Sequence, residues 1–470
     1  MIERFLKFEE DHSLLERKVK HFLFWPYIRF DIYMKLTSIK NDWIFEDKVN
    51  SVKAYDLLCA LLNCTIYHPL LHAKHKDILF FTHQRRVWDG REYRCIYTDD
   101  VADEFGNLCI SAENLYNNGH LRPASTKRLL YLDYITIQAE VKSWLPRLMN
   151  RKCNSQLSEL ATWLDAIITE EFQVSLGQRY ITELLVCKYY RHYFRKRAVT
   201  KLLKKIHPRV IVEVVGYDAN RLILNESASE LGITTIELQH GVINEEHIAY
   251  NYAKKSDYQF FPDRLFIWGE YFKNARYPIS DENIIITGFP HFEKSIRQYP
   301  KKNAADSVRI IVLSQPGFSE MLLQQMIVLI DLLDNSGKSY SFVLKPHPDE
   351  YVFYTSSKWD MLNNYCNAIL APKEVSLYEL LSESDIQISI YSTAIYEGLA
   401  YGLKTFLYNI DEKSAYTKTL VERRYARYFK DAAELAEIIT DDEYFKCINE
   451  SVFFAPSAKE NIMREIRKYI

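Results

Sequence analysis

Two histidines in the second half of the chain have the chemistry and the surroundings for acid–base and phosphate work. His240 lies within Gln239-His240-Gly241, and His347 lies within Lys345-Pro346-His347-Pro348. An imidazole titrates near neutral pH, so His240 can act as a general base toward a hydroxyl group. Lys345 and His347 fall on the same side of an extended segment, where an ammonium and an imidazole can stabilise a departing phosphate.

A third motif, Ser392-Thr393, marks the start of a short predicted helix that ends at Gly402. As the N-cap, Ser392 can accept a backbone N–H or turn toward a ligand, and a helix N-terminus favours a bound phosphate. Glu397 lies about one turn into that helix, within reach of a ribose diol when a phosphate occupies the helix start. The structural alternatives are a serine that only caps and a glutamate that lies at the surface.

Each motif follows an apolar run that is typical of a buried strand, at residues 234–238, 340–344 and 385–390. Further strands are predicted at 210–216, 265–269, 284–288 and 308–313, with helices between them. Strand–helix–strand units form right-handed crossovers in parallel sheets, and ligands bind along the carboxyl edges of such sheets. The motifs are therefore expected to gather at one cleft.

The length of 470 residues predicts two domains rather than one core. A charged stretch between Pro290 and Ser307 is taken as the linker. We expect an amino-terminal domain over 1–295, which includes long helices between 135 and 206, and a carboxyl-terminal domain over 305–470. The predicted fold class is α/β, with two Rossmann-like domains that face a cleft.

Two loops are further candidates for contact with ligands. Ser314–Gly317 follows the first strand of the carboxyl-terminal domain, and it places Gln315 and Gly317 at the expected phosphate edge. In the amino-terminal domain, the predicted strand 77–82 runs into a loop that holds Arg85, Arg86 and Asp89. Arginines and a carboxylate at a strand end can bind a substrate, and a solvated surface hairpin is the alternative.

Composition narrows the classes of function. A formal net charge of −2 gives no basic field for duplex nucleic acid, and the basic, aromatic run 189–197 is more typical of an amphipathic helix. The chain contains no GxxxxGK[ST], GxSxG or HExxH pattern, and its eight cysteines lack zinc-ligand spacing. We expect neither a metal nor a cofactor, and no nucleic-acid partner.

The amino terminus lacks the apolar stretch of a signal peptide, which predicts a cytoplasmic protein. Residues 12–36 are rich in aromatic and apolar side chains and include Trp25-Pro26-Tyr27-Ile28-Arg29. Such a segment can touch a membrane surface, so peripheral attachment to the inner membrane is an open alternative. Packing of the segment on its own domain is the commoner reason for such a pattern and is favoured here.

Taken in order, Gln-His-Gly, Lys-Pro-His-Pro and Ser-Thr resemble the motifs of bacterial surface-polysaccharide transferases of GT-B architecture. This family includes capsule polysialyltransferases, Kdo transferases and teichoic-acid glycerophosphotransferases. The resemblance covers approximately residues 205–410. It implies that the carboxyl-terminal domain holds a nucleotide donor, with His347, Ser392 and Thr393 at its phosphate. Sialyltransferases usually have an acidic pair before the glycine at 241, whereas glycerophosphotransferases have a His-Gly pair, which supports His240 as the base.

The function implied by the resemblance is a metal-independent glycosyltransferase of capsule or O-antigen biosynthesis. It would move a sugar from a nucleotide-activated donor, with a CMP-sugar preferred, to a hydroxyl group of a glycan or lipid-linked glycan. A CDP-polyol phosphotransferase of the teichoic-acid type and a non-catalytic nucleotide-sugar-binding assembly protein stay open. The donor sugar, the acceptor and the oligomeric state are not determined by these motifs.

Roles follow from these motifs for the catalytic, donor-binding and acceptor-binding groups. For catalysis we expect His240 as base, oriented by Glu237, and His347 at the leaving phosphate. The residues expected to bind the donor are Lys345, Ser392, Thr393, Glu397, Gln315 and Gly317. Those expected to bind the acceptor are Arg85, Arg86, Asp89 and Gln239.

Overall fold

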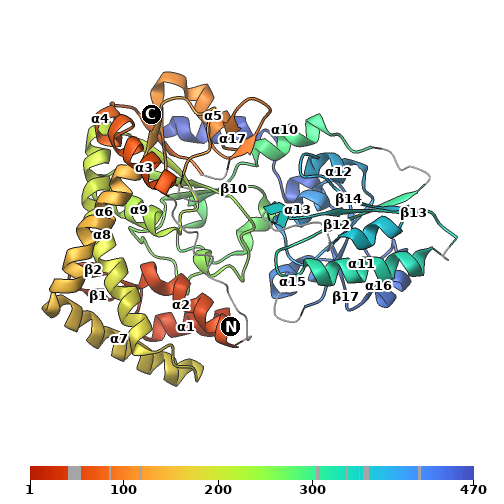
Figure 1. Ribbon diagram of the computed structural model, residues 1–470, viewed down its shortest axis with the longest axis horizontal. Coiled ribbons are helices and arrows are strands. Elements are labelled where there is room, and N and C mark those ends of the chain that lie inside the picture. Colours follow the sequence, from red (N-terminus) through yellow and green to blue (C-terminus); the bar gives the residue numbers. More distant parts are fainter. Residues whose placement is uncertain are drawn as a thin grey trace.

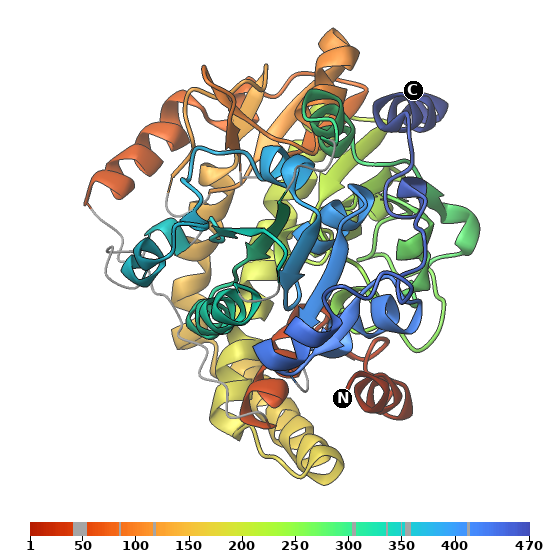
Figure 2. The same cartoon turned by 90° about the vertical axis from the view of Figure 1, so that its right-hand side faces the viewer.

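A computed structural model describes residues 1–40, 54–83, 86–115, 119–302, 307–334, 337–348, 350–352, 359–410 and 414–470. It contains two α/β domains, each built on a parallel sheet, which lie side by side (Figure 1). Figure 2 shows the molecule from the side of the carboxyl-terminal domain. The predicted fold class is confirmed, because two Rossmann-like domains face a cleft as in the GT-B arrangement.

The sheet of the amino-terminal domain has seven parallel strands in the order β11-β10-β9-β8-β3-β6-β7. Counted along the chain within the sheet, its first six strands follow the order 3-2-1-4-5-6 of dinucleotide-binding folds, and β11 extends that order. The strands are β3 (Ile78–Phe81), β6 (Cys109–Glu113), β7 (Leu129–Tyr131), β8 (Val210–Val214), β9 (Thr234–Leu238), β10 (Arg264–Ile267) and β11 (Ile284–Ile286). The strand order reverses between β3 and β8, which is where a ligand crevice is expected.

The sheet of the carboxyl-terminal domain has six parallel strands in the order β14-β13-β12-β15-β16-β17, again 3-2-1-4-5-6. Its strands are β12 (Val308–Leu313), β13 (Tyr340–Lys345), β14 (Ala368–Leu370), β15 (Ile386–Ser389), β16 (Lys404–Tyr408) and β17 (Arg427–Phe429). Helices α11 (Ser319–Leu333) and α16 (Ala432–Ile438) cover one face, and α12 (Leu377–Glu383) and α13 (Thr393–Ala400) cover the other (Figure 1). The reversal here lies between β12 and β15.

Burial on both faces explains why the strands could be recognised as apolar runs. All residues of β3 and β8 are buried, because helices cover both sides of a parallel sheet. The two carboxylates within β8 and β9, Glu213 and Glu237, are also buried and lie directly opposite each other across the two strands. Because the strands are buried on both faces, the first polar residues after each apolar run mark the carboxyl end of that strand.

The remaining helices of the amino-terminal domain surround its sheet. They are α1 (Ile2–Asp11), α2 (Trp25–Lys40), α3 (Ala54–Ile66), α4 (Pro69–His72), α5 (Asp99–Phe105), α6 (Asp133–Met149), α7 (Arg151–Phe172), α8 (Gln178–Ile206) and α9 (Ala219–Glu230). Phe24, Trp25 and Tyr27 are buried, so the aromatic segment packs on its own domain, as favoured from the sequence. Two short antiparallel pairs, β1 (Lys18–Val19) with β2 (Phe22–Leu23) and β4 (Val87–Trp88) with β5 (Tyr93–Arg94), complete the domain.

The end of the chain returns to the amino-terminal domain. Helix α15 (Lys418–Glu422) belongs to the carboxyl-terminal lobe, but α17 (Ala458–Ile466) lies beside α5 and packs Ile462 and Ile466 under the first sheet (Figure 1). A Cβ atom on Gly288 would lie 2.2 Å from the carbonyl oxygen of Ala455, so only glycine permits this approach. The predicted linker contains α10 (Pro290–Gln298), and the domain limits at 295 and 305 remain a proposal.

None of the helices in the described part of the chain is both long and apolar enough to cross a membrane.

Candidate functional site

A cavity of about 630 Å³ lies between the carboxyl edges of the two sheets, and we call it the interdomain cavity. From the amino-terminal domain and α10 it is lined by residues that include Tyr97, His240, Gly241, His247, Trp268, Phe289 and His291. From the carboxyl-terminal domain it is lined by residues that include Gln315, His347, Tyr378, Tyr391, Ser392, Thr393, Glu397 and Tyr416. A Cβ atom on Gly241 would be 4.0 Å from Oγ1 of Thr393, so the two domains come close at these loops. Pockets of this size hold small-molecule substrates.

His240 lies in a loop that is held rigidly at the end of β9. The Gln239 side chain donates to the carbonyl of Gly241 and accepts from the N–H of Trp268, each at 2.8 Å. Tyr97 Oη donates to the carbonyl of His240 at 2.8 Å. The imidazole packs against the ring of Tyr217, with centroids 5.8 Å apart. Gln239 therefore shapes the loop and does not line the interdomain cavity, contrary to its predicted role in binding an acceptor.

His347 lines the interdomain cavity, but Lys345 does not. The Lys345 ammonium donates to the carbonyls of Pro372 and Val375 at 3.1 and 2.8 Å, and burial lowers its pKa. The expectation that Lys345 and His347 lie on the same side of the chain and share a phosphate is therefore wrong. Strand β13 ends at Lys345, so the alternation of side chains that would place both on one side does not continue through Pro346.

The start of α13 forms the opposite wall. Ser392 Oγ accepts from the N–H of Ala394 at 3.3 Å, so Ser392 caps the helix and also lines the cavity. Gln315 binds both the N–H and the carbonyl of Tyr391, and this joins the loops that follow β12 and β15 at the reversal of strand order. Gly317 is not among the lining residues. The helix start, Ser392 and Thr393 together offer backbone N–H groups and hydroxyls to an anion.

Glu397 is the one carboxylate that lines the interdomain cavity among the described residues. Tyr378 Oη donates to it at 2.6 Å, and burial raises the pKa of Glu397 to about 7. The side chain thus lies one turn from Thr393, as the sequence predicted, and can accept hydrogen bonds from a ligand when ionised.

Four histidines but no lysine or arginine line the interdomain cavity in the part of the chain that the structure describes. His247 and His291 were not predicted, and burial lowers the pKa of each to about 4, so both are neutral at pH 7. His291 follows β11, so the pattern that predicted His240, a histidine shortly after a buried strand, also applies to His291. His247 had no such signal. The start of a helix attracts an anion through its backbone N–H groups, and a neutral imidazole can donate a further hydrogen bond to the same ligand.

Aromatic rings form flat surfaces on both sides of the interdomain cavity. Phe289 stacks between Tyr97 and Trp268, with centroids 5.5 and 4.7 Å apart. Across the cavity, Tyr391 stacks with Tyr416 at 5.9 Å. Such faces can pack against a sugar ring or a base.

Glu237 does not touch the interdomain cavity. It is fully buried, and it accepts hydrogen bonds from Tyr250 Oη at 2.6 Å and from the N–H of Gly216 at 2.8 Å. Burial raises its pKa to about 7. The contacts of Glu237 therefore do not support its predicted role of orienting His240, because its carboxylate binds Tyr250 and Gly216 instead.

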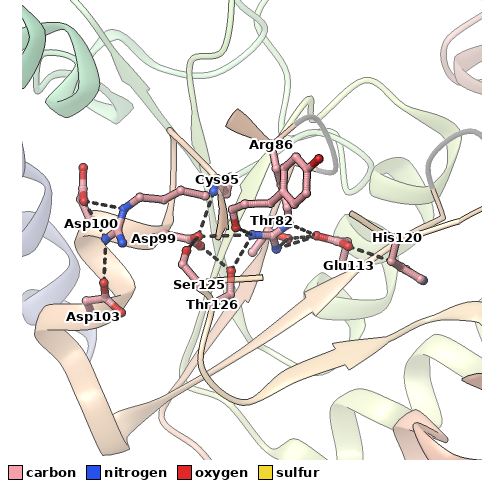
Figure 3. Close-up of polar contacts among 12 residues, drawn as sticks. Thr82, Arg86, Cys95, Asp99, Asp100, Asp103, Glu113, His120, Ser125 and Thr126 are labelled. Carbon is pink, nitrogen blue, oxygen red and sulfur yellow. Dashed lines mark hydrogen bonds and ion pairs between the residues drawn. The ribbon is translucent and has the colours of Figure 1, made fainter. Parts of the chain in front are cut away.

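The loop expected to bind an acceptor is also used differently. Figure 3 shows the guanidinium of Arg86 between two carboxylates, at 3.2 Å from Asp99 and 2.6 Å from Glu113. Asp89 accepts from the N–H groups of Arg91 and Glu92 in the turn between β4 and β5, which is the hairpin alternative. Arg85 lies outside the described residues. Arg86 is needed to neutralise buried carboxylates and is not available to a substrate.

The described residues contain no group of three or more His, Cys, Asp or Glu side chains arranged to hold a metal ion. Metal independence stays a prediction.

Comparisons with known proteins do not identify the activity. No family model matches the chain. Over 229 residues it is 28% identical to an uncharacterized protein of Methanocaldococcus jannaschii, which aligns 47% of this chain with 38% of that protein. The chain thus spans well under half the length of the curated relative that it matches.

Several solved structures are similar at low sequence identity. A UDP-GlcNAc 2-epimerase from Neisseria meningitidis, bound to UDP-GlcNAc, has a TM-score of 0.45 at 11% identity and covers 83% of this chain and 99% of its own. The corresponding enzyme from Methanocaldococcus jannaschii has a TM-score of 0.49 at 11% identity, with the same coverage. A wall teichoic acid polymerase has a TM-score of 0.44 at 14% identity and covers 89% of this chain and 98% of its own. At these values the function has to be inferred from the cavity itself.

Proposed function

We propose that this protein is a metal-independent glycosyltransferase that uses a nucleotide-activated sugar. The observation that carries the proposal is the composition of the interdomain cavity: His240 on one wall faces a wall of His347, the α13 helix start and Glu397. The first wall offers a general base for the hydroxyl group of the acceptor substrate. The second wall offers hydrogen-bond donors to the nucleotide phosphate and a carboxylate that can accept hydrogen bonds from the ribose diol. The motif resemblance supports a role in bacterial capsule or O-antigen synthesis, with a CMP-sugar preferred.

The reaction is a direct displacement at the anomeric carbon of the donor. His240 takes the proton of the acceptor hydroxyl as the new glycosidic C–O bond forms. The bond between that carbon and the phosphate oxygen breaks, and its electron pair leaves with the nucleotide phosphate. His347, Ser392, Thr393 and the N–H groups at the start of α13 stabilise the negative charge that develops on the phosphate.

The experiment compares His240→Ala and His347→Ala with His21→Ala, an exposed histidine of the amino-terminal domain that serves as the matched control. His240→Ala should lose at least about a hundredfold in turnover, since a general base typically contributes that much. His347→Ala should lose a similar factor, about a hundredfold or more, because it removes a donor to the charge that develops on the phosphate. Binding of CMP, CDP, UDP and GDP, measured by calorimetry, identifies the nucleotide. Activity equal to the wild type in both cavity variants, or the absence of binding to all four nucleotides, would contradict the proposal.

A second candidate is a CDP-polyol phosphotransferase of the teichoic-acid type, which the His240-Gly241 pair favours. Both reactions use the same base, but they break different bonds: the glycosyltransferase releases the whole nucleotide phosphate, and the phosphotransferase transfers a phosphoryl group with its polyol. Mass spectrometry of the product against the starting acceptor separates them, because a new phosphodiester is formed only in the second case. A chain that binds nucleotide without turnover would support the assembly protein instead.

Peripheral membrane attachment is also part of the proposal, but on a different surface from the one considered in the sequence. Helix α6 exposes Val141, Trp144, Leu145 and Leu148 at 67, 64, 52 and 64%, which is one stripe at helical spacing. Helix α3, which contacts α6, exposes Leu58, Leu61 and Leu62 in the same pattern. Exposed Lys142, Arg151 and Lys152 flank the α6 stripe. Apolar side chains with flanking cations suit an anionic lipid surface, where a lipid-linked acceptor would be found.

A further inference from the structure

A second cavity, of about 320 Å³, lies among α6, α8 and α9, and we call it the basic cavity. The charged and polar residues that line it include Glu140, Lys188, Arg191, His192, Arg195 and Asn220. Helix α9 starts just after β8, and Asn114, which contacts Arg195, follows β6, so the basic cavity lies at the carboxyl edge of the first sheet. That is the same edge on which His240 lies.

The cations of the basic cavity differ in how their charge is balanced. Lys188 lies 2.9 Å from Asp31, Arg191 lies 2.5 Å from Glu140, and His192 Nε2 lies 2.8 Å from Glu226. Arg195 has no carboxylate within ion-pair distance among the described residues. Its Nη2 donates to Oδ1 of Asn114 at 2.9 Å, and its Nε has no acceptor although the side chain is buried.

Burial of the Arg195 guanidinium without a carboxylate partner costs free energy unless another group supplies the negative charge. Arg195 is only 8% exposed, and burial lowers its pKa to about 10. Asp218 and Glu140 act on it favourably, and Arg191 and Arg221 act on it unfavourably, all at longer range. A buried guanidinium is normally paired, because desolvation of an ion outweighs its hydrogen bonds to neutral groups. An oxyanion from outside the chain would supply the missing negative charge.

We propose that the basic cavity binds a phosphate group, with the Arg195 guanidinium as its principal ligand. The planar fork of an arginine matches two oxygens of a phosphate, so Arg195 can bind the group with two parallel hydrogen bonds. The volume of about 320 Å³ exceeds that of a single ion and leaves room for a larger molecule that carries the phosphate. Resting on the proposed function, this molecule is the acceptor, and the phosphate is its link to a lipid or to the next repeating unit.

Tyr217 contacts one wall of the interdomain cavity and lies close in the chain to a wall of the basic cavity. Its ring packs on the ring of His240, with centroids 5.8 Å apart, and on Phe30 at 5.7 Å. Two residues later, Ala219 lines the basic cavity. An acceptor anchored by its phosphate would pass Tyr217 to bring a hydroxyl group to His240. The phosphate site thus acts as a positioning site and not as part of the bond-breaking machinery.

Asn114→Asp provides the decisive test, because it places a carboxylate where Arg195 now contacts an amide. The variant should fold with an unchanged or raised Tm, since the guanidinium gains an internal partner. Its affinity for phosphate should fall at least tenfold. Arg195→Met, which keeps an unbranched side chain without the charge, should show the same loss. Arg197→Met is the matched control, because Arg197 is exposed on the same helix.

Binding is measured by calorimetry and by the rise in Tm with sodium phosphate against sodium chloride at equal ionic strength. Inorganic phosphate and glycerol 3-phosphate are the two probes. Tighter binding of the ester supports an acceptor phosphate, whereas tighter binding of the inorganic ion limits the site to free phosphate and removes the acceptor role. Equal affinities in the wild type and Asn114→Asp, or no binding of either probe to the wild type, would overturn the site.

Nucleotide binding in the same variants separates this inference from the proposed function. Asn114→Asp should retain the nucleotide affinity of the wild type and show a KM for the acceptor raised at least tenfold, with kcat nearly unchanged. Absence of nucleotide binding to the wild type would instead contradict the proposed function. In that case the phosphate titrations would still test the phosphate site independently.

Discussion

Glu397→Gln should stabilise the protein at alkaline pH and weaken its binding of the nucleotide. Burial raises the pKa of this carboxyl from 4.5 to about 7, although the hydrogen bond from Tyr378 acts in the other direction. The shift corresponds to about 3 kcal/mol against the ionised form. Because the folded pKa lies above the unfolded one, the folded state holds more protons between these values. The free energy of unfolding contributed by Glu397 is therefore largest below pH 4.5 and falls as pH rises to about 7. A neutral glutamine avoids that loss.

The assay compares unfolding of the wild type and Glu397→Gln at several values between pH 5 and pH 8. The variant should be more stable than the wild type by less than about 1 kcal/mol at pH 5 and by up to about 3 kcal/mol at pH 8. Glu213 and Glu237 are also buried with raised pKa values, but they are common to both proteins and cancel in the difference. Glu437→Gln, at an exposed position on α16, is the control.

Nucleotide binding should change in the opposite direction. Ionised Glu397 can accept from a ribose diol, and a hydrogen bond to a charged group contributes about 1.5–3 kcal/mol, so affinity at pH 8 should fall roughly 10- to 100-fold in Glu397→Gln. A stability difference that does not vary with pH would refute the assigned pKa. Unchanged nucleotide affinity at pH 8 would refute the ribose contact.

Three other substitutions test separate parts of the structure. Lys345→Met should leave nucleotide affinity within about twofold and lower stability by about 1–2 kcal/mol, because the ammonium binds loop carbonyls, as calorimetry and thermal unfolding will show. Gly288→Ala should cost about 1–3 kcal/mol and release α17, seen as faster hydrogen exchange there, because its φ is +91° and Ala455 blocks a Cβ. Trp144→Asp combined with Leu148→Asp should abolish sedimentation with vesicles of phosphatidylglycerol and phosphatidylethanolamine.

Each of these predictions has a contrary outcome. A tenfold loss of nucleotide affinity in Lys345→Met would restore its predicted role at the phosphate. Unchanged exchange of α17 in Gly288→Ala would show that the tail is held elsewhere. For the membrane surface, Val328→Asp combined with Leu332→Asp on α11 is the control, since these are also exposed apolar residues on a helix. Equal sedimentation of the two double variants, or a dimer that only the α6 variant disrupts, would assign the α6 stripe to another role.

The strand-edge motifs could be found in the sequence because of how parallel sheets are buried. Strands such as β8 and β13 are covered on both faces, so they appear as almost continuous apolar runs, and the first polar residues after them lie at the ligand edge. His240, His347, Ser392 and Thr393 were predicted in this way, and all four line the interdomain cavity. Repetition of the pattern also predicted two domains of the same class.

The direction of a side chain beyond the strand end could not be obtained in the same way. Gln239 lies one residue before His240, and Lys345 lies two residues before His347, but each side chain binds backbone groups of a neighbouring segment. Arg86 was expected at a substrate and instead neutralises Glu113, which is 27 residues away. A buried charge or amide must find partners, and those partners come from elements that only the fold brings together.

The amino-acid sequence by itself determined the fold class, the strand edge at which the interdomain cavity lies and two of the histidines that line it, since strand periodicity and polar strand ends are local properties. Tertiary structure decided which polar residues are left for a ligand, and it added His247, His291 and the unbalanced charge of Arg195. The physical reason is that burial and counter-charge are properties of a packed environment. Both depend on residues that are distant along the chain.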